Sequence, residues 1–158
     1  PIGMTSLDED LRKEGFRTRT DILGYRVLLA GPEEAAKLGC DEGSEVVLIE
    51  RVRWANDEPL AVLTNLMLGS FAPTLTQLAT TPLYESLRTR GIEIVAGKQV
   101  VSARNSNERE SELLEMVPGD AVLTVKRWVY DRAGDVVEYG DHIYNPALHS
   151  LSFSSAAK

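Results

Sequence analysis

The same order of predicted elements occurs twice in this chain. Residues 33–67 read as helix, glycine turn, strand, turn and strand, and residues 109–144 repeat that order with one residue inserted at the turn. Gly43 then corresponds to Gly119 and Arg51 to Arg127, a spacing of 76 residues in both pairs. Two such strand–helix–hairpin units favour one antiparallel sheet flanked by short helices, an α+β fold. Chance similarity between two hairpins is the alternative interpretation.

Capping signals predict four helices. Ser6 and Glu9 form a capping box for a helix over residues 6–14, and Pro32 and Gly39 bound a helix over 31–39. A third helix is predicted over 80–91, with Thr81 as the cap and Pro82 at the first position. A fourth is predicted after a cap at Asn105 and Glu108, ending before Pro118. Strands are predicted over residues 16–30, 45–54, 60–67, 92–104, 121–130 and 135–145.

Composition indicates a single globular domain and weighs against some classes of function for it. The chain has 158 residues and a net charge of −7, which weighs against a nucleic-acid surface on this domain. A lone cysteine, Cys40, excludes an internal disulfide and favours a reducing, cytoplasmic compartment. Apolar runs are far shorter than the roughly 20 residues that a membrane helix needs. The start, "PIGMTSLDED", lacks the features of a signal peptide and suggests a piece of a longer chain.

Two arginines interrupt an apolar strand. Val47 and Ile49 lead into Arg51 and Arg53 on one face, while Val52 and Trp54 occupy the other face. Both faces of this strand are therefore expected to be covered. Two guanidinium groups side by side suit a phosphate or carboxylate between them. The alternative is a solvated strand end, where the arginines pair with Glu50 or Asp57 at little gain in stability.

Other candidate sites are less specific. The N-terminus of the first predicted helix, at Ser6, offers backbone N–H groups to an anion, but the helix supplies its own acids. Glu138, His142 and Tyr144 form a polar row on one face of the last strand, which either faces solvent or lines a cavity. Two histidines and one cysteine match no metal-ligand spacing, and no phosphate loop or nucleophile motif occurs. The sequence therefore indicates no metal, no cofactor and no enzyme.

Four segments follow one another in a known pattern: "GMTSLDEDLRKEGF", "GSEVVLIERVRWANDEPLA", "PLYESLRTRG" and "GDAVLTVKRWVYDRAGDVVEYGDHIY". Their order and spacing resemble UTRA domains, the effector-binding C-terminal domains of HutC-type GntR transcription regulators, over about residues 4–153. The resemblance implies a chorismate lyase-like fold. Residues 1–15 would be a linker and first helix, and residues 16–153 a ligand-binding and dimerisation domain. A homodimer is expected, with DNA bound only through an N-terminal winged helix-turn-helix absent from this chain.

The resemblance also implies a binding site for a small anionic metabolite, phosphorylated or carboxylated. Arg51 and Arg53 match the anion-clamping arginines of the family. Tyr84, in "PLYESL", matches the tyrosine of the family's "SLY" element, and Glu138 and Tyr144 match ligand-side residues of the last strand. Thr5, Ser6 and Leu7 match a segment that lends backbone N–H groups to the ligand.

Two positions and the ending of the last strand depart from the family pattern. Pro82 replaces a serine, Leu63 replaces a glutamate, and the ending "YNPALH" replaces "YRxDRY". These departures imply an effector that is less polar beyond its anionic head. The alternatives are a chorismate lyase-like enzyme and a dimerisation module with a vestigial pocket.

Overall fold

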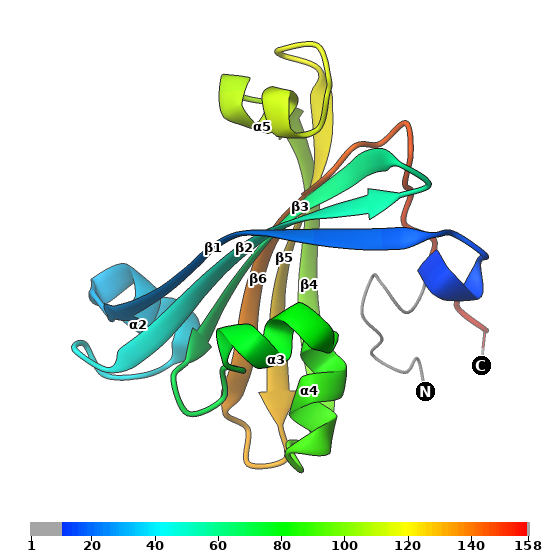
Figure 1. The fold of residues 1–158 in the computed structure, drawn as a ribbon. Coiled ribbons are helices and arrows are strands. Elements are labelled where there is room, and N and C mark those ends of the chain that lie inside the picture. Colours follow the sequence, from blue (N-terminus) through cyan, green and yellow to red (C-terminus); the bar gives the residue numbers. More distant parts are fainter. Residues whose placement is uncertain (1–10, 158) are drawn as a thin grey trace.

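A six-stranded antiparallel sheet forms the centre of the molecule (Figure 1). The structure is a computed structural model and describes residues 11–157. The strands are β1 (Thr18–Leu29), β2 (Glu45–Ala55), β3 (Glu58–Leu68), β4 (Ile94–Asn105), β5 (Ala121–Asp131) and β6 (Val136–Tyr144). Their order across the sheet is β1-β2-β3-β6-β5-β4, and all neighbours are antiparallel. The predicted α+β class and antiparallel sheet are confirmed.

The strand order has the symmetry that the sequence repeat predicts. Each half runs strand, helix, hairpin: β1, α2 (Pro32–Leu38), β2 and β3, then β4, α5 (Glu108–Leu113), β5 and β6. The two halves join at the sheet centre, where β3 pairs with β6. The equivalent glycines, Gly43 and Gly119, both have positive φ, at 84° and 89°, which L side chains rarely adopt. The duplicated unit therefore reappears as two halves of one sheet.

The helices between and beside the strands correct two predictions. The helix predicted over 80–91 is the shorter α4 (Leu83–Thr89), and it is preceded by a separate short helix, α3 (Leu75–Thr80), that was not predicted. Thr81 ends α3 instead of capping α4, and Pro82 is the N-cap of α4, with no side-chain hydrogen bond. The predicted cap at Asn105 is also wrong: Asn105 ends β4, and Asn107 forms the capping box with Glu110. Of the helix predicted over 6–14, residues 11–13 are helical, Glu14 lies in the turn that follows, and residues 6–10 lie outside the described residues.

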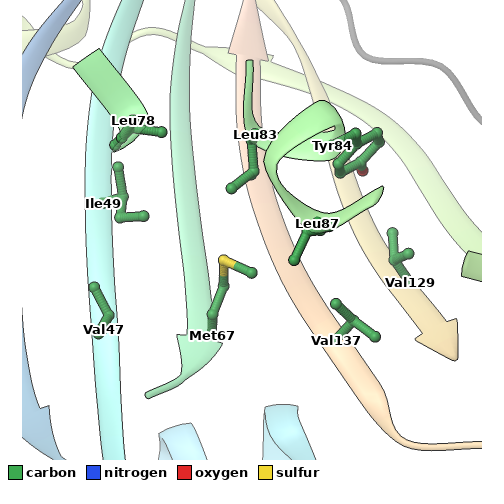
Figure 2. Packing of buried hydrophobic residues seen from close by; sticks show 9 residues of the cluster. All are labelled: Val47, Ile49, Met67, Leu78, Leu83, Tyr84, Leu87, Val129 and Val137. Carbon is green, nitrogen blue, oxygen red and sulfur yellow. The ribbon is translucent and has the colours of Figure 1, made fainter. Parts of the chain in front are cut away.

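The face of the sheet beneath α3 and α4 is called the site face here. Its core brings side chains of both helices onto four strands (Figure 2). The buried members of this cluster are Val47, Ile49, Met67, Leu78, Leu83, Tyr84, Leu87, Val129 and Val137. A second cluster on the same face includes Leu11, Leu60, Leu63, Val125 and Tyr144. Polar side chains lie between these two apolar clusters.

The opposite face of the sheet, the back face, is covered at two corners. Ala35 and Leu38 of α2 pack on Val46, Leu66 and Tyr139. Leu114, directly after α5, packs on Val52, Val62, Val122 and Ile143. Both faces of β2, β3 and β6 are therefore buried, which is why these strands are apolar on both sides. No helix within residues 11–157 is both long and apolar enough to cross a membrane.

Candidate functional site

Strand register brings the polar residues of four strands onto the site face. Arg51 lies opposite Leu63, Leu63 opposite His142, and His142 opposite Val125. One row further along, Asn65 lies opposite Gly140 and Gly140 opposite Arg127. Directly opposed residues of a sheet point to the same side. The polar row of the last strand is thus on the same face as the two arginines of β2.

These side chains line a cavity of about 40 Å³ under the start of α4, called here the central cavity. Its walls are Arg51, Arg53, Leu63, Asn65, Pro82, Leu83, Tyr84, Arg127, Glu138, His142 and Tyr144. Six residues predicted from the sequence are therefore brought together: Arg51, Arg53, Leu63, Tyr84, Glu138 and Tyr144. The other three, Thr5, Ser6 and Leu7, lie outside the described residues. The row of Glu138, His142 and Tyr144 lines a cavity and does not face solvent.

The two arginines of β2 are buried, and the solvated-strand-end interpretation is wrong. Arg51 and Arg53 are each 6% exposed. The acids proposed as their surface partners pair elsewhere, Glu50 with Arg109 and Asp57 with Arg17. Burial of a guanidinium group needs compensating hydrogen bonds or charge. Arg51 finds one partner across the strand pair, donating from Nη2 to Asn65 Oδ1 at 2.8 Å.

A chain of hydrogen bonds continues from Arg51 through the cavity wall. Asn65 Nδ2 donates to Glu138 Oε1 at 2.5 Å, and the Tyr84 hydroxyl donates to Glu138 Oε2 at 2.8 Å. The guanidinium of Arg127 stacks over the Tyr84 ring, 5.0 Å from its centroid. Only one orientation of the Asn65 amide accepts from an arginine and donates to a carboxylate at once. This chain links β2, β3, β6, α4 and β5, so the site holds both repeats together.

Burial sets the protonation of the cavity. Desolvation raises the pKa of Glu138, against opposing effects of Arg127, Tyr84, Asn65 and Arg51. Desolvation and then the charges of Arg51 and Arg127 lower the pKa of His142 to about 3, so His142 is neutral at neutral pH. Desolvation likewise raises the pKa of Tyr144 to about 12. The cavity therefore presents cations, neutral hydrogen-bond donors and acceptors, and one carboxyl group, that of Glu138, whose charged form is disfavoured by burial.

His142 and Gly140 shape the floor of the cavity. Nδ1 of His142 is buried and has no hydrogen-bond partner among the described residues. A Cβ at position 140 would lie 2.5 Å from His142 Nε2 and 3.0 Å from Glu138 Oε1, too close for any side chain. Glycine at this position therefore leaves room for the His142 ring beside Glu138.

A larger cavity of about 180 Å³, the adjoining cavity, shares three wall residues with the central one: Arg51, Arg53 and Pro82. Its other walls come from β1, from α3 and its C-terminal end, and from Arg12. The two β2 arginines thus stand at the junction of a small polar cavity and a larger one. A ligand with its anionic group at this junction would reach into both.

Three residues of the site were missed by the sequence-based assignment. Arg127 was matched to Arg51 by the repeat, but its position beside the same cavity follows only from the pairing of the two halves at β3 and β6. His142 belonged to the predicted polar row. Asn65 was detectable as the one amide in the largely apolar strand "LAVLTNLML", in which the only other polar residue is Thr64.

Comparison with known proteins places this arrangement in a family. The UTRA domain family matches residues 13–150. The chain belongs to the UTRA domain family. The predicted resemblance is thereby confirmed.

Individual relatives agree with this assignment. The chain is 29% identical over 144 residues to the HTH-type transcriptional repressor NagR of Bacillus subtilis, covering 90% of this chain but only 59% of NagR. A crystal structure assigned as a transcriptional regulator from Streptomyces coelicolor is 37% identical, with a TM-score of 0.79 over 85% of this chain and 91% of that chain. The effector domain of PhnF from Mycobacterium smegmatis shares the fold at 23% identity, with a TM-score of 0.89 over 99% and 98% of the two chains.

Proposed function

We propose that this UTRA domain is the effector-binding and dimerisation domain of a GntR/HutC-type transcription regulator and binds a small anionic metabolite. The observation that carries the proposal is the convergence of three arginines on one cavity, of which Arg51 and Arg53 are buried and Arg127 is half-buried. Glu138 is the one acidic residue among the described walls of that cavity. The local charge of these walls is therefore positive in a chain whose net charge is −7.

A bound anion is expected to be stabilised most strongly at the junction of the two cavities, beside Arg51 and Arg53. Guanidinium groups present paired N–H donors that match phosphate and carboxylate oxygens. Each charge-assisted hydrogen bond contributes about 1.5–3 kcal/mol, so three or four support the roughly 8 kcal/mol of micromolar binding. The buried setting weakens solvent screening of these charges. The arginines shared by the two cavities are thus the favoured position for the anionic head.

The remainder of the effector is expected to be less polar than a sugar. Leu63 stands on the cavity wall directly opposite Arg51, where a glutamate would accept from ligand hydroxyls. Pro82 removes a hydroxyl at the mouth shared with the adjoining cavity. The adjoining cavity is lined by Ile22, Leu78 and Ala79 as well as by threonines. These walls favour a ligand with an anionic head and a partly apolar body.

The longer protein is expected to act on DNA. NagR and PhnF are named as HTH-type transcriptional repressors, and this chain spans about 60% of the length of each. We infer that the longer protein is a homodimer and that its DNA contacts lie in a domain outside this chain. We expect it to be located in the cytoplasm. The named relatives are repressors, which supports regulation over a lyase activity.

Thermal-shift measurements with phosphorylated and carboxylated metabolites, and with inorganic phosphate, test effector binding. A ligand at 100 times its dissociation constant adds about 2.7 kcal/mol of stability. Because 1 kcal/mol moves Tm by about 2–4 °C at this size, shifts of about 5–11 °C are expected. Arg51→Ala should remove the shift while the variant stays folded by circular dichroism. Arg132→Ala, a surface change at a residue paired with Glu93, should keep it.

Two results would contradict the proposal. A full shift retained by Arg51→Ala would show that the cavity arginine does not hold the ligand. The absence of any shift across the anions would favour a vestigial pocket.

A further inference from the structure

A cavity on the back face of the sheet, called here the back cavity, lies between α2 and the strands beneath it. Its volume is about 180 Å³, against about 40 Å³ for the central cavity. Its floor is formed by Leu48 of β2, Leu66 of β3 and Tyr139 of β6, which are directly opposed in the strand register. A dry cavity of about 150 Å³ is large enough for one benzene molecule. The back cavity therefore has room for one ring or a short aliphatic chain.

The polar walls of the back cavity are mostly acidic. Helix α2 contributes Glu33, Glu34 and Lys37, and β6 contributes Asp141. Among the described residues, no cation lies within salt-bridge distance of any of these three carboxylates. Lys126 lies opposite Asp141 on β5, but it is exposed and forms no ion pair with it. Three carboxylates against one ammonium group give these walls a net negative charge that favours a cation.

Tyr139 brings a polar group without a protein partner to the same cavity. The residue is only 4% exposed, and its hydroxyl makes no hydrogen bond with any described residue. Desolvation, and then the charges of Asp141 and Glu33, raise the pKa of this hydroxyl, which therefore lies near both carboxylates. A buried hydroxyl without a partner is unfavourable, and a ligand that donates a hydrogen bond would supply the missing partner.

The ring of Tyr139 already attracts a cation of the protein itself. The Nζ atom of Lys37 lies 5.2 Å from the centroid of this ring. Such cation–π contacts show that an ammonium group is favourable at the aromatic wall. Lys37 is half-buried, and its long flexible stem lets the ammonium group move out towards solvent. A ligand cation can therefore take the place of the lysine ammonium group.

A metal ion does not suit the back cavity. No group of three or more potential metal ligands converges within residues 11–157. Three leucines also line the cavity, Leu28, Leu48 and Leu66, and they offer nothing to a metal. An organic cation uses both parts of the lining, because binding pockets combine apolar walls with a few polar groups that fix orientation.

We propose that the back cavity binds a primary amine with a small aromatic or aliphatic body. The ammonium group lies at the rim between Asp141 and Glu33 and donates to the Tyr139 hydroxyl, and the apolar body lies on Leu48 and Leu66. This site is independent of the proposed anion site. It lies on the opposite face of β2, β3 and β6 and takes the opposite charge, so the two ligands can be bound together.

Calorimetric titration of the 158-residue chain with 2-phenylethylamine tests the site. The matched neutral probe is 2-phenylethanol, which has the same ring and a hydroxyl in place of the ammonium group. The amine should bind about ten times more tightly than the alcohol, since only the amine forms charge-assisted contacts. In ¹⁵N-labelled protein the largest amide shifts should fall in α2, which contributes no wall to the central cavity. Equal affinities, no binding of the amine, or shifts that leave α2 unchanged would overturn the inference.

Three variants with opposite expected signs test the named residues. Asp141→Asn and Glu33→Gln should each weaken amine binding about fivefold, because each removes one carboxylate from the rim. The exposed Glu33 serves if Asp141→Asn lowers the urea midpoint. Lys37→Met keeps the unbranched stem and removes the competing ammonium group, so it should strengthen binding about threefold.

Asp57→Asn is the matched control, since it makes the same change of charge at an exposed residue paired with Arg17. It should leave the affinity for 2-phenylethylamine unchanged. Equal weakening by Asp57→Asn and Asp141→Asn would show that only the overall charge of the protein attracts the amine and would overturn the site. Weaker binding to Lys37→Met would refute the exchange of ammonium groups at the Tyr139 ring.

Discussion

Replacing Glu138 by glutamine isolates the charge of the most buried acid among the residues that the structure describes. Glu138 is fully buried and accepts hydrogen bonds from Asn65 and Tyr84. The glutamine oxygen can still accept from Asn65, and its amide can donate to the Tyr84 hydroxyl, which then acts as an acceptor. Glu138→Gln therefore reproduces the protonated form of the carboxyl group with little change in shape.

The sign of the expected effect follows from the pKa. Burial raises the folded pKa of Glu138 above its unfolded value. The folded state then binds more protons than the unfolded state between these two values. Stability from protonated Glu138 is fully present below the unfolded pKa and is lost as pH rises through the folded pKa. Glu138→Gln cannot lose it, so the variant should gain stability relative to wild type as pH rises, by at most about 1.4 kcal/mol per pH unit.

Urea denaturation of both proteins from about pH 3 to about pH 8 measures this difference. Glu93→Gln is the matched control with the opposite sign, because Arg132 lowers the pKa of the exposed Glu93 carboxyl group. That variant should lose stability relative to wild type as pH rises through the folded and then the unfolded pKa of Glu93. A difference between wild type and Glu138→Gln that is constant over the pH range would refute the reasoning. It would mean that the charges of Arg127 and Arg51 and the two hydrogen-bond donors cancel the effect of burial on the pKa of Glu138.

Three further changes probe the structure. Tyr84→Phe removes the donor to Glu138 Oε2 and should lower the free energy of unfolding by about 1–3 kcal/mol; an unchanged urea midpoint would contradict the hydrogen bond. Asn107→Ala should cost about 1 kcal/mol through loss of the α5 capping box, whereas Asn105→Ala should change stability by less than half of that, and the reverse order would restore Asn105 as the cap. Gly140→Ala should cost about 1–3 kcal/mol by forcing the buried His142 ring away from its position, measured by the same denaturation; full wild-type stability would show that the floor can yield.

Sequence periodicity was sufficient for the sheet because both halves repeat one pattern. Alternation located β2, β3, β5 and β6, and the repeat indicated how many strands share the sheet. Helix starts were harder: Thr81 followed by Pro82 has the composition of a cap, yet the chain ends α3 there before starting α4. Local propensity does not show whether a threonine before a proline ends one helix or begins the next.

Site residues could be predicted where their residue type is unusual for the strand that carries them. Arg51 and Arg53 stood out because cations are rare in a strand that is apolar on both faces. His142 and Asn65 gave weaker signals, since a neutral polar residue fits many environments. The contact between Glu138 and Tyr84 joins residues 54 positions apart, and no local pattern encodes such a pairing.

The central cavity lies at the seam between the two halves of the chain, which has a consequence for divided versions of the protein. A cut in the segment between β3 and β4 would release two fragments, one carrying Arg51 and Asn65, the other Arg127, Glu138 and His142. Each fragment would expose one central strand, and neither would hold a complete site. An anion bound, as proposed, by Arg51 of one fragment and Arg127 of the other would add to the β3–β6 pairing and favour reassembly, so the recombined halves would report the presence of the effector.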